Sequence, residues 1–292
     1  MTPNPPLADL PVGACFIDGG EFRPIDELRE RYAQLDGFVY EVVRIIDGVP
    51  LFLEEHTARL RRSALRSGIY AGMEASRLRV DIHRLVQRTG LTIGNVKIAL
   101  GGGDPSGHAC LASFIIHRYP DERMYANGVS VGIFPGERHD PTVKRHNPEL
   151  RRRLRERLAK SGLYDLLLEN SSLFLTEGSR TNVFFVDRDG LVTPPEEDVL
   201  PGITRLKVIE IATECDIPVA ELKIRREVLK SFDAAFLTGT SAKLLPVTSI
   251  NGRPFRVDHP LVRHLMAAYD RLIDEDIQKA RAASAEDIAL RA

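Results

Sequence analysis

The sequence has few cysteines, almost no net charge and no long apolar run. Its three cysteines, Cys15, Cys110 and Cys215, are far apart and in no metal-like spacing, which argues against a disulfide framework and favours a reducing compartment. A formal net charge of -1 gives no overall field that would draw the chain to nucleic acid or to an anionic membrane surface. No stretch approaches the roughly 18 apolar residues of a membrane span, and the N-terminus lacks the regions of a signal peptide. We therefore expect a soluble cytoplasmic protein whose partners are small molecules.

The composition indicates a globular protein with room for two domains. A hydrophobic content of 43% over 292 residues can fill one large or two medium cores. Residues 1–11 contain four prolines and indicate an extended arm. The polar segment Arg118–Arg123 contains Pro120 and separates two strand-rich blocks, so we interpret it as an interdomain linker. We expect a smaller N-terminal α/β domain, residues 1–120, and a larger C-terminal α/β domain, residues 121–292.

Strand and helix signals alternate along both blocks, which is typical of the α/β class. β-Branched and aromatic runs predict strands at 38–46, 49–53, 95–100, 111–117, 129–134, 165–169, 173–176, 182–186, 191–193 and 234–238. Periodic apolar positions predict helices at 53–67, 74–88, 148–160, from the Pro201-Gly202 turn to about 215, and at 259–282. Asp47-Gly48 predicts a hairpin turn, and segment 101–108 predicts a glycine-rich loop that allows close approach of a ligand.

The stretch Leu175–Phe185 carries the most distinctive group of polar residues. Glu177, several small or polar residues and Asn182 lie at the start of an apolar, aromatic run, so the carboxylate is placed to act on a buried group. Taken alone, such a residue is more commonly a turn carboxylate that caps backbone amides.

Lys144 is the candidate nucleophile upstream of this stretch. It precedes Arg145 and His146, whose charge would favour the neutral form of its amine, and a neutral amine can form a Schiff base. Taken alone, a solvated surface lysine is the more common case, because lysines are mostly exposed.

Three places offer donors to an anion. The Pro201-Gly202 turn opens a helix whose free amides at Ile203 and Thr204, with the positive helix end, would seat a phosphate. Thr240 follows a strand and offers a further amide and hydroxyl, and Arg59 adds a cation. Singly, each of these is also common as a helix start, a turn or a solvated helix face.

Three other patterns do not indicate a functional site. The run Arg151–Arg157 is interrupted by leucine and glutamate and fits a solvated helix face better than a nucleic-acid contact. The glycines at 101–103 lack the ending of a phosphate-binding P-loop. His139 and His146 have no partners at metal-ligand spacing, so no metal is expected.

Taken together, these motifs resemble those of the class IV (fold type IV) pyridoxal-phosphate enzymes. That family carries the signature Glu-Gly-x-x-x-Asn, here Glu177 to Asn182, and a Schiff-base lysine upstream, as Lys144 stands 33 residues before Glu177. The resemblance runs from about Asp18 to Ile250. It implies an α/β (α+β), two-domain fold type IV architecture with pyridoxal 5'-phosphate at the domain interface, and a homodimer, since the family is usually dimeric or larger.

The resemblance also implies a role for each matching residue. Lys144 would carry the Schiff base and move a proton, and Glu177 would keep the pyridine nitrogen protonated. The other expected cofactor contacts are Arg59, Asn182, Ile203, Thr204 and Thr240. The expected substrate contacts are Tyr40, Ser106 and His108.

Within the family, the D-amino-acid aminotransferase branch is nearest, because Tyr40 before Glu41 matches its active-site tyrosine. The expected function is transfer of an amino group between an amino acid or amine and a 2-keto acid. An aminodeoxychorismate lyase-like enzyme, a branched-chain aminotransferase-like enzyme and a cofactor-free binding protein on this fold remain alternatives.

Two features depart from the D-amino-acid branch. Ser106 replaces the arginine of Pro-Arg-x-His, and Asp36-Gly37-Phe38 replaces the usual Gly-Asp-Gly. The first change removes a charge that would bind the substrate carboxylate. Arg44 or Arg138 could supply a compensating cation.

Overall fold

The computed structural model describes residues 10–69, 75–104 and 107–289, and these form two compact units. Unit 1 comprises the described residues up to Arg118, the segment Val143–His146 and the described residues from Leu272 onward. Unit 2 comprises Tyr119–Thr142 and Asn147–Arg271. The two domains 1–120 and 121–292 remain a prediction, but packing groups the segment that carries Lys144 with unit 1 rather than with the C-terminal block.

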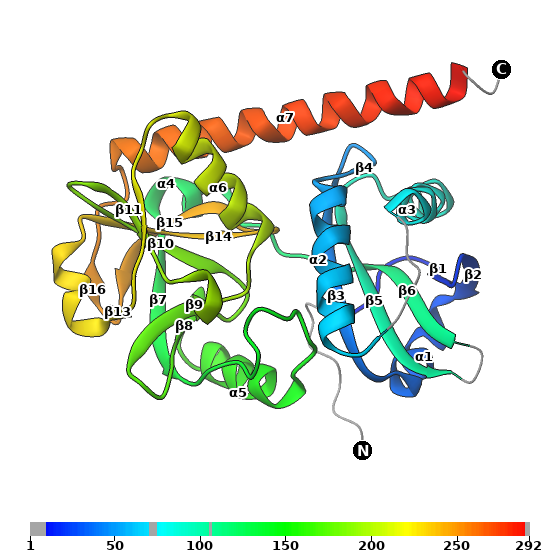
Figure 1. The fold of residues 1–292 in the computed structure, drawn as a ribbon, viewed down its shortest axis with the longest axis horizontal. Helices are drawn as coiled ribbons and strands as arrows, with labels where there is room; N and C mark the ends of the chain where they lie inside the picture. Colours follow the sequence, from blue (N-terminus) through cyan, green and yellow to red (C-terminus); the bar gives the residue numbers. More distant parts are fainter. Residues whose placement is uncertain (1–9, 70–74, 105–106, 290–292) are drawn as a thin grey trace. The chain divides into compact units, whose positions relative to one another are not determined.

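Unit 1 is built on a sheet in which neighbouring strands are antiparallel. Its six strands lie in the order β2-β1-β6-β5-β3-β4. They are β1 (Cys15–Asp18), β2 (Glu21–Pro24), β3 (Asp36–Ile46), β4 (Val49–Pro50), β5 (Gly94–Asp104) and β6 (Gly107–Ile115). Its helices are the 3-10 turn η2 (Ile25–Glu27), α1 (Leu28–Gln34), α2 (Leu53–Arg66), α3 (Ala75–Thr89) and the later part of α7 (Pro260–Ala289). Figure 1 shows α2 running beside β3.

Alternation along the strands gives this sheet two different faces, because successive side chains of a strand point to opposite sides. Val39 and Val43 of β3 pack in one apolar cluster with Leu60 of α2. Tyr40, between them in sequence, packs in another cluster with Leu28 of α1. Residues of β3 that are neighbours in sequence therefore serve two separate environments.

Unit 2 is built on a mixed sheet of ten strands in the order β12-β11-β10-β14-β15-β7-β8-β9-β13, with β16 paired to β15. The parallel pairs are β11 with β12, β15 with β7, and β7 with β8. The strands are β7 (Val129–Pro135), β8 (Asp165–Glu169), β9 (Phe174–Gly178), β10 (Asn182–Asp187), β11 (Gly190–Thr193), β12 (Val219–Glu221), β13 (Ile224–Arg225), β14 (Ala234–Gly239), β15 (Lys243–Ile250) and β16 (Arg253–Pro254). The helices are α4 (Glu122–Asn127), α5 (Pro148–Ala159), α6 (Ile203–Glu214), the start of α7 and the 3-10 turns η3 (Glu196–Asp198) and η4 (Arg226–Ser231). Helix α6 lies beside β14 (Figure 1).

The predicted helices are confirmed, and most of their ends lie within a residue or two of the expected ones. Helix α5 begins where Asn147 accepts a hydrogen bond from the Leu150 N–H, with Pro148 in its first turn. Helix α7 is longer than predicted and continues to Ala289. Among the described residues, no helix is both long and apolar enough to cross a membrane.

The predicted loop at 101–108 is wrong over much of its length, since β5 continues to Asp104 and β6 begins at Gly107. Gly101 pairs with Phe38 of β3 on one side and with Ala109 of β6 on the other. Hydrogen-bond ladders on both sides hold this backbone extended, which outweighs the low strand propensity of glycine.

The predicted strand at 49–53 is also shorter than expected. Strand β4 ends at Pro50, and Phe52 takes a left-handed conformation with φ of 49° at the start of α2. The sequence patterns predict none of β1, β2, β12, β13, β15, β16, α1 and α4.

Candidate active site

A buried ionic group lies where α2 covers the sheet of unit 1. Glu41 of β3 accepts two hydrogen bonds from Arg59, with Nε 2.7 Å from Oε1 and Nη2 2.6 Å from Oε2. The Nδ1 atom of His56 lies 2.8 Å from Oε2. His56 and Arg59 are three residues apart on α2, so both reach the same strand. This two-pronged contact fixes the plane of the Arg59 guanidinium.

Burial and pairing together set the charges of this group. Burial by itself would raise the pKa of Glu41, but the charge and hydrogen bonds of Arg59, helped by His56, outweigh it and hold that pKa well below its usual range. Burial lowers the pKa of His56, and this effect exceeds the opposing effect of Glu41. At neutral pH the group therefore consists of a carboxylate, a guanidinium and a neutral imidazole.

Arg59 was one of the predicted cofactor contacts, whereas Glu41 and His56 were not predicted to have a role. The structure buries Arg59, so it is no solvated helix face, and its contact with a cofactor remains a prediction. The sequence does contain a signal for Glu41, the ion-pair partner of Arg59. Glu41 falls on the same side of β3 as Val39 and Val43, and a charge on an apolar face requires a partner.

Lys144 lies in a short segment that pairs with β3. Its carbonyl oxygen accepts a hydrogen bond from the Tyr40 N–H at 3.0 Å, and its own N–H donates to Oγ of Ser63 on α2 at 3.3 Å. Its half-buried side chain places Nζ 5.1 Å from the centroid of the Tyr40 ring. Two predicted site residues, Lys144 and Tyr40, are thus brought together, and the main chain of Lys144 is fixed from two elements.

A second lysine lies on the other side of this sheet from Glu41, buried among aromatic rings. Lys97 of β5 is 4% exposed, and its Nζ lies 4.9, 5.3 and 5.2 Å from the ring centroids of Tyr32, Phe38 and Tyr40. The His146 ring stacks on Phe38 with a centroid distance of 4.8 Å. The faces of aromatic rings attract cations, so these rings stabilise a buried ammonium group. Sequence reasoning assigned Lys97 no role.

In unit 2, Glu177 lies near the end of β9 and is 2% exposed. Its Oε2 accepts a hydrogen bond from the Leu200 N–H at 3.1 Å, and its Oε1 lies 3.0 Å from Nε of Arg138. Arg138, a candidate cation for the substrate on sequence grounds, is therefore engaged by a carboxylate of the protein. Glu177 is thus a buried, ion-paired strand residue and not the turn carboxylate that was the more common alternative.

Asn182 is the first residue of β10, and like Glu177 it forms a hydrogen bond with the main chain of Leu200. Its Nδ2 donates to the Leu200 carbonyl at 2.9 Å, so the two side chains bind both polar atoms of the Leu200 main chain. A Cβ at Gly202 would collide with Oδ1 of Asn182. Asn182 therefore positions the turn that leads into α6, and its contact with a cofactor remains a prediction.

Helix α6 begins after Gly202, which has no side chain to cap it. The N–H groups of Ile203 and Thr204 belong to the first turn and have no acceptor within the helix, and such a helix start attracts anions. Oγ1 of Thr204 lies 3.3 Å from the hydroxyl of Tyr269 on α7. Thr240 lies in the turn that follows β14, the strand that pairs with β10.

Asp165 at the start of β8 orders the loop between Glu177 and Asn182. One of its oxygens accepts hydrogen bonds from the N–H and hydroxyl groups of Ser179, and the other accepts one from the Thr181 hydroxyl. A Cβ at Gly178 would collide with Thr181 and Asp165. The residues between Glu177 and Asn182 thus shape the loop, and Asp165 is a supporting residue that the sequence motif does not reveal.

The predicted site residues fall into one group in each unit. Unit 1 holds Tyr40, Arg59 and Lys144, and unit 2 holds Glu177, Asn182, Ile203, Thr204 and Thr240. Of the other two predicted substrate contacts, Ser106 lies outside the described residues, and only the main chain of His108, in β6, is described.

Comparisons with known proteins give a consistent result. The family model described as amino-transferase class IV matches residues 38–250. A D-alanine aminotransferase of Bacillus licheniformis is 27% identical over 265 residues, covering 87% of this chain and 93% of that protein. A putative branched-chain-amino-acid aminotransferase of Methanocaldococcus jannaschii is 30% identical over 234 residues, covering 74% of this chain and 79% of that protein.

A similar solved structure is the branched-chain aminotransferase of the thermophilic archaeon Thermoproteus uzoniensis with norvaline, with a TM-score of 0.80 and 23% identity. The match covers 92% of this chain and 97% of that one. The expected fold is confirmed by this similarity.

Proposed function

The chain belongs to the class IV aminotransferase family, and on that premise we propose that it uses pyridoxal 5'-phosphate to move an amino group between an amino acid or amine and a 2-keto acid. The observation that carries the proposal is Glu177. It is a buried carboxylate fixed by Arg138 and by the Leu200 N–H, and a carboxylate so fixed can hold the proton of a pyridine nitrogen.

The residues present fit this cofactor. Lys144 supplies a primary amine on a fixed main chain, and the start of α6 supplies N–H groups for a phosphate. Thr238 is the cross-strand partner of Asn182, and its buried hydroxyl has no hydrogen-bond partner among the described residues. This hydroxyl can therefore donate a hydrogen bond to a ligand at this end of β14. Arg59 supplies a guanidinium already oriented by Glu41.

Each residue then has a defined task. When bound, pyridoxal 5'-phosphate supplies a ring that accepts electrons from the substrate carbon. Lys144 would hold the cofactor covalently through Nζ and, once released, would carry the proton removed from the substrate. Glu177 would keep the proton on the ring nitrogen, while Ile203, Thr204, Thr240 and Arg59 would bind the phosphate.

For the substrate we propose a D-amino acid or an amine. The D-alanine aminotransferase of Bacillus licheniformis supports the first, and Tyr40 lies beside Lys144 as that assignment requires. Branched-chain aminotransferases are equally good relatives, so a branched L-amino acid is the second candidate. Ser106 brings no charge for a substrate carboxylate, which favours amines over amino acids unless another cation compensates.

The experiment is a spectrum followed by a substrate panel. We expect a visible absorption band that borohydride reduction removes, with the reduced adduct on the peptide that contains Lys144. The panel compares kcat/KM for D-alanine, L-leucine, 1-phenylethylamine and aminodeoxychorismate. A colourless protein that binds no cofactor would leave the binding-protein alternative. Release of pyruvate from aminodeoxychorismate without a keto acid would indicate a lyase.

We also propose a homodimer, the usual assembly of the family. Light scattering on the purified chain tests this, and a mass equal to one chain of 32.6 kDa would contradict it.

A further inference from the structure

Two of the lysines contact the same aromatic ring. Nζ of Lys97 lies 5.2 Å from the centroid of Tyr40, and Nζ of Lys144 lies 5.1 Å from it. The two nitrogen atoms are therefore no more than about 10 Å apart, a separation at which two charges in a protein still affect each other. The chain has only eight lysines, so two at one tyrosine need an explanation.

Lys97 is built to keep its charge in a buried place. Burial would ordinarily favour a neutral amine, but three ring faces surround Nζ, and each such contact stabilises the cation. Its position is rigid, because β5 is paired on both sides, with Val42 and Ser113 as the cross-strand partners of Lys97.

We infer that Lys97 is a positioning residue for Lys144: a fixed positive charge at the Tyr40 ring that favours the neutral amine of Lys144. The inference rests on the proposed function, since a neutral amine is the form that bonds to a carbonyl carbon and accepts a proton. The effect acts across space and requires no contact between Lys97 and a substrate.

The nearby groups Glu41, Arg59, His56 and Arg145 do not supply this effect. Glu41 and Arg59 form a pair whose charges cancel, and His56 on α2 is neutral because burial lowers its pKa. Arg145, the next residue in the chain, is exposed and donates from Nη2 to Oγ of Ser67 at 2.9 Å, so solvent screens its charge.

The groups that face Lys97 include the phenols of Tyr32 on α1 and Tyr40 on β3, together with the Phe38 ring, on which His146 stacks. The charge near Lys144 therefore comes from a strand about fifty residues away in sequence rather than from Arg145.

The test is a titration of the lysines by NMR, with 13C at the ε carbon, on the full chain loaded with pyridoxamine 5'-phosphate so that Lys144 is a free amine. Two charges no more than about 10 Å apart at an effective dielectric constant of about 20 shift a titration by about one pH unit or more. We expect Lys97→Met to raise the midpoint of Lys144 by about that much and Lys97→Arg, which keeps the charge, to leave it in place. Lys144→Ala assigns the signal.

Two results would overturn the inference. One is a titration midpoint of Lys144 that does not change in Lys97→Met. If that variant then loses only kcat/KM for substrates with a carboxylate, Lys97 is a substrate contact instead. The other is a wild-type titration in which the Lys97 amine is neutral at a pH at which Lys144 is still charged. This measurement uses only the wild-type protein. The proposed function fails separately, through absence of the absorption band and of the borohydride adduct at Lys144.

Discussion

The side-chain amide of Asn182 occupies the space that a Cβ of residue 202 would need. Gly202 has φ of -65° and ψ of 136°, a conformation open to any residue, so glycine is required here by space and not by backbone strain. Because Nδ2 of Asn182 also holds the Leu200 carbonyl, this contact sets where α6 begins.

Gly202→Ala is therefore expected to displace the start of α6. We expect a loss of about 1 to 3 kcal/mol in the free energy of unfolding, as for other overpacked sites, and a weaker affinity for pyridoxal 5'-phosphate. Denaturant unfolding and a fluorescence titration with the cofactor measure the two effects. In the double variant Gly202→Ala, Asn182→Ala, part of the stability should return; two strictly additive losses would contradict the steric explanation.

Glu41→Gln tests the buried ionic group through pH. Arg59 would lose a buried partner, so we expect a loss of about 3 to 5 kcal/mol near pH 7. The folded-state pKa of Glu41 is below its ordinary value of 4.5, so its stabilising effect is complete above that pH and is lost as the pH falls further. Urea unfolding should show the gap between wild type and variant closing by up to about 1.4 kcal/mol per pH unit below 4.5.

The matched control is Glu149→Gln, which breaks an exposed ion pair with Arg152. Such pairs contribute little to stability, so this variant should match the wild type at pH 7. A gap for Glu41→Gln that stays constant down to pH 3 would show that the carboxylate is not charged in the folded protein.

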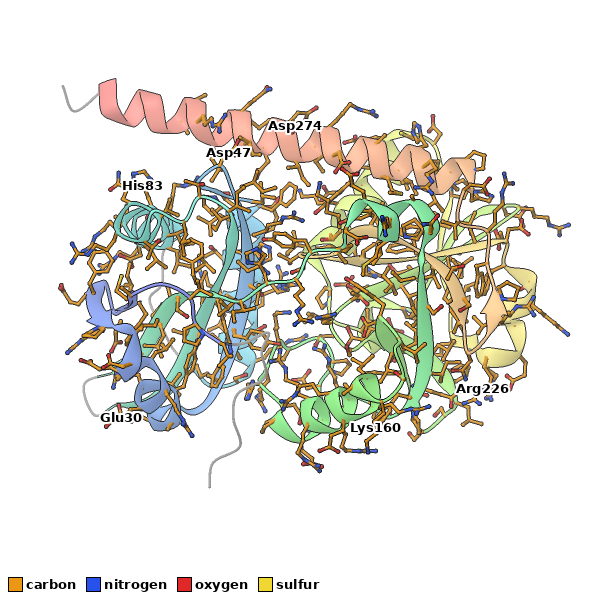
Figure 2. All side chains as sticks on the ribbon, turned by 180° about the vertical axis from the view of Figure 1, so that it is seen from behind. Glu30, Asp47, His83, Lys160, Arg226 and Asp274 are labelled. Carbon is orange, nitrogen blue, oxygen red and sulfur yellow. The ribbon has the colours of Figure 1, made fainter. Side chains whose placement is uncertain are left out.

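Lys144→Ala should abolish turnover and the absorption band while the protein still folds. The bonds to Tyr40 and Ser63 come from the main chain of Lys144, and the contact of its side chain with the Tyr40 ring is worth about 0.5 to 1 kcal/mol. Lys160→Ala is the control, since Lys160 lies exposed at the end of α5 (Figure 2) and should behave as the wild type. Turnover in Lys144→Ala would end the proposed role.

Glu177→Gln should retain bound cofactor but lower kcat by at least about 100-fold, because an amide cannot hold the pyridinium proton and a preorganised charge is lost. The Leu200 N–H can still find an acceptor in the glutamine oxygen, so the loop should persist. Single-turnover kinetics on the cofactor-saturated variant measure the effect. A rate close to that of the wild type would place another acid at the ring nitrogen.

Ser106→Arg should raise kcat/KM for D-alanine relative to 1-phenylethylamine. A charge-assisted hydrogen bond to the substrate carboxylate is worth about 1.5 to 3 kcal/mol, which is about tenfold or more in that ratio. Ser106→Gln adds similar length without charge and should leave the ratio unchanged. An equal rise in both variants would refute a charge effect.

Much of the fold follows from the sequence by local rules. The periodic apolar positions of α2, the asparagine and proline that start α5 and the apolar runs of β8 and β10 each specify their own element. Glu177, Asn182 and Lys144 were predicted as site residues by the resemblance to the class IV enzymes, since on local pattern alone a turn carboxylate and a surface lysine are the more common cases.

Only the tertiary structure decides which charged side chains of the candidate site become neighbours. Arg138 and Glu177 are 39 residues apart, and Lys97 and Lys144 are 47 apart; neither pairing is visible in any local pattern. Strand register brings the two lysines together: the pairing of segment 143–146 with β3 and of β5 with β3 places both at Tyr40. Register is set by which apolar faces are buried over the whole sheet, and charged side chains follow wherever that burial takes them.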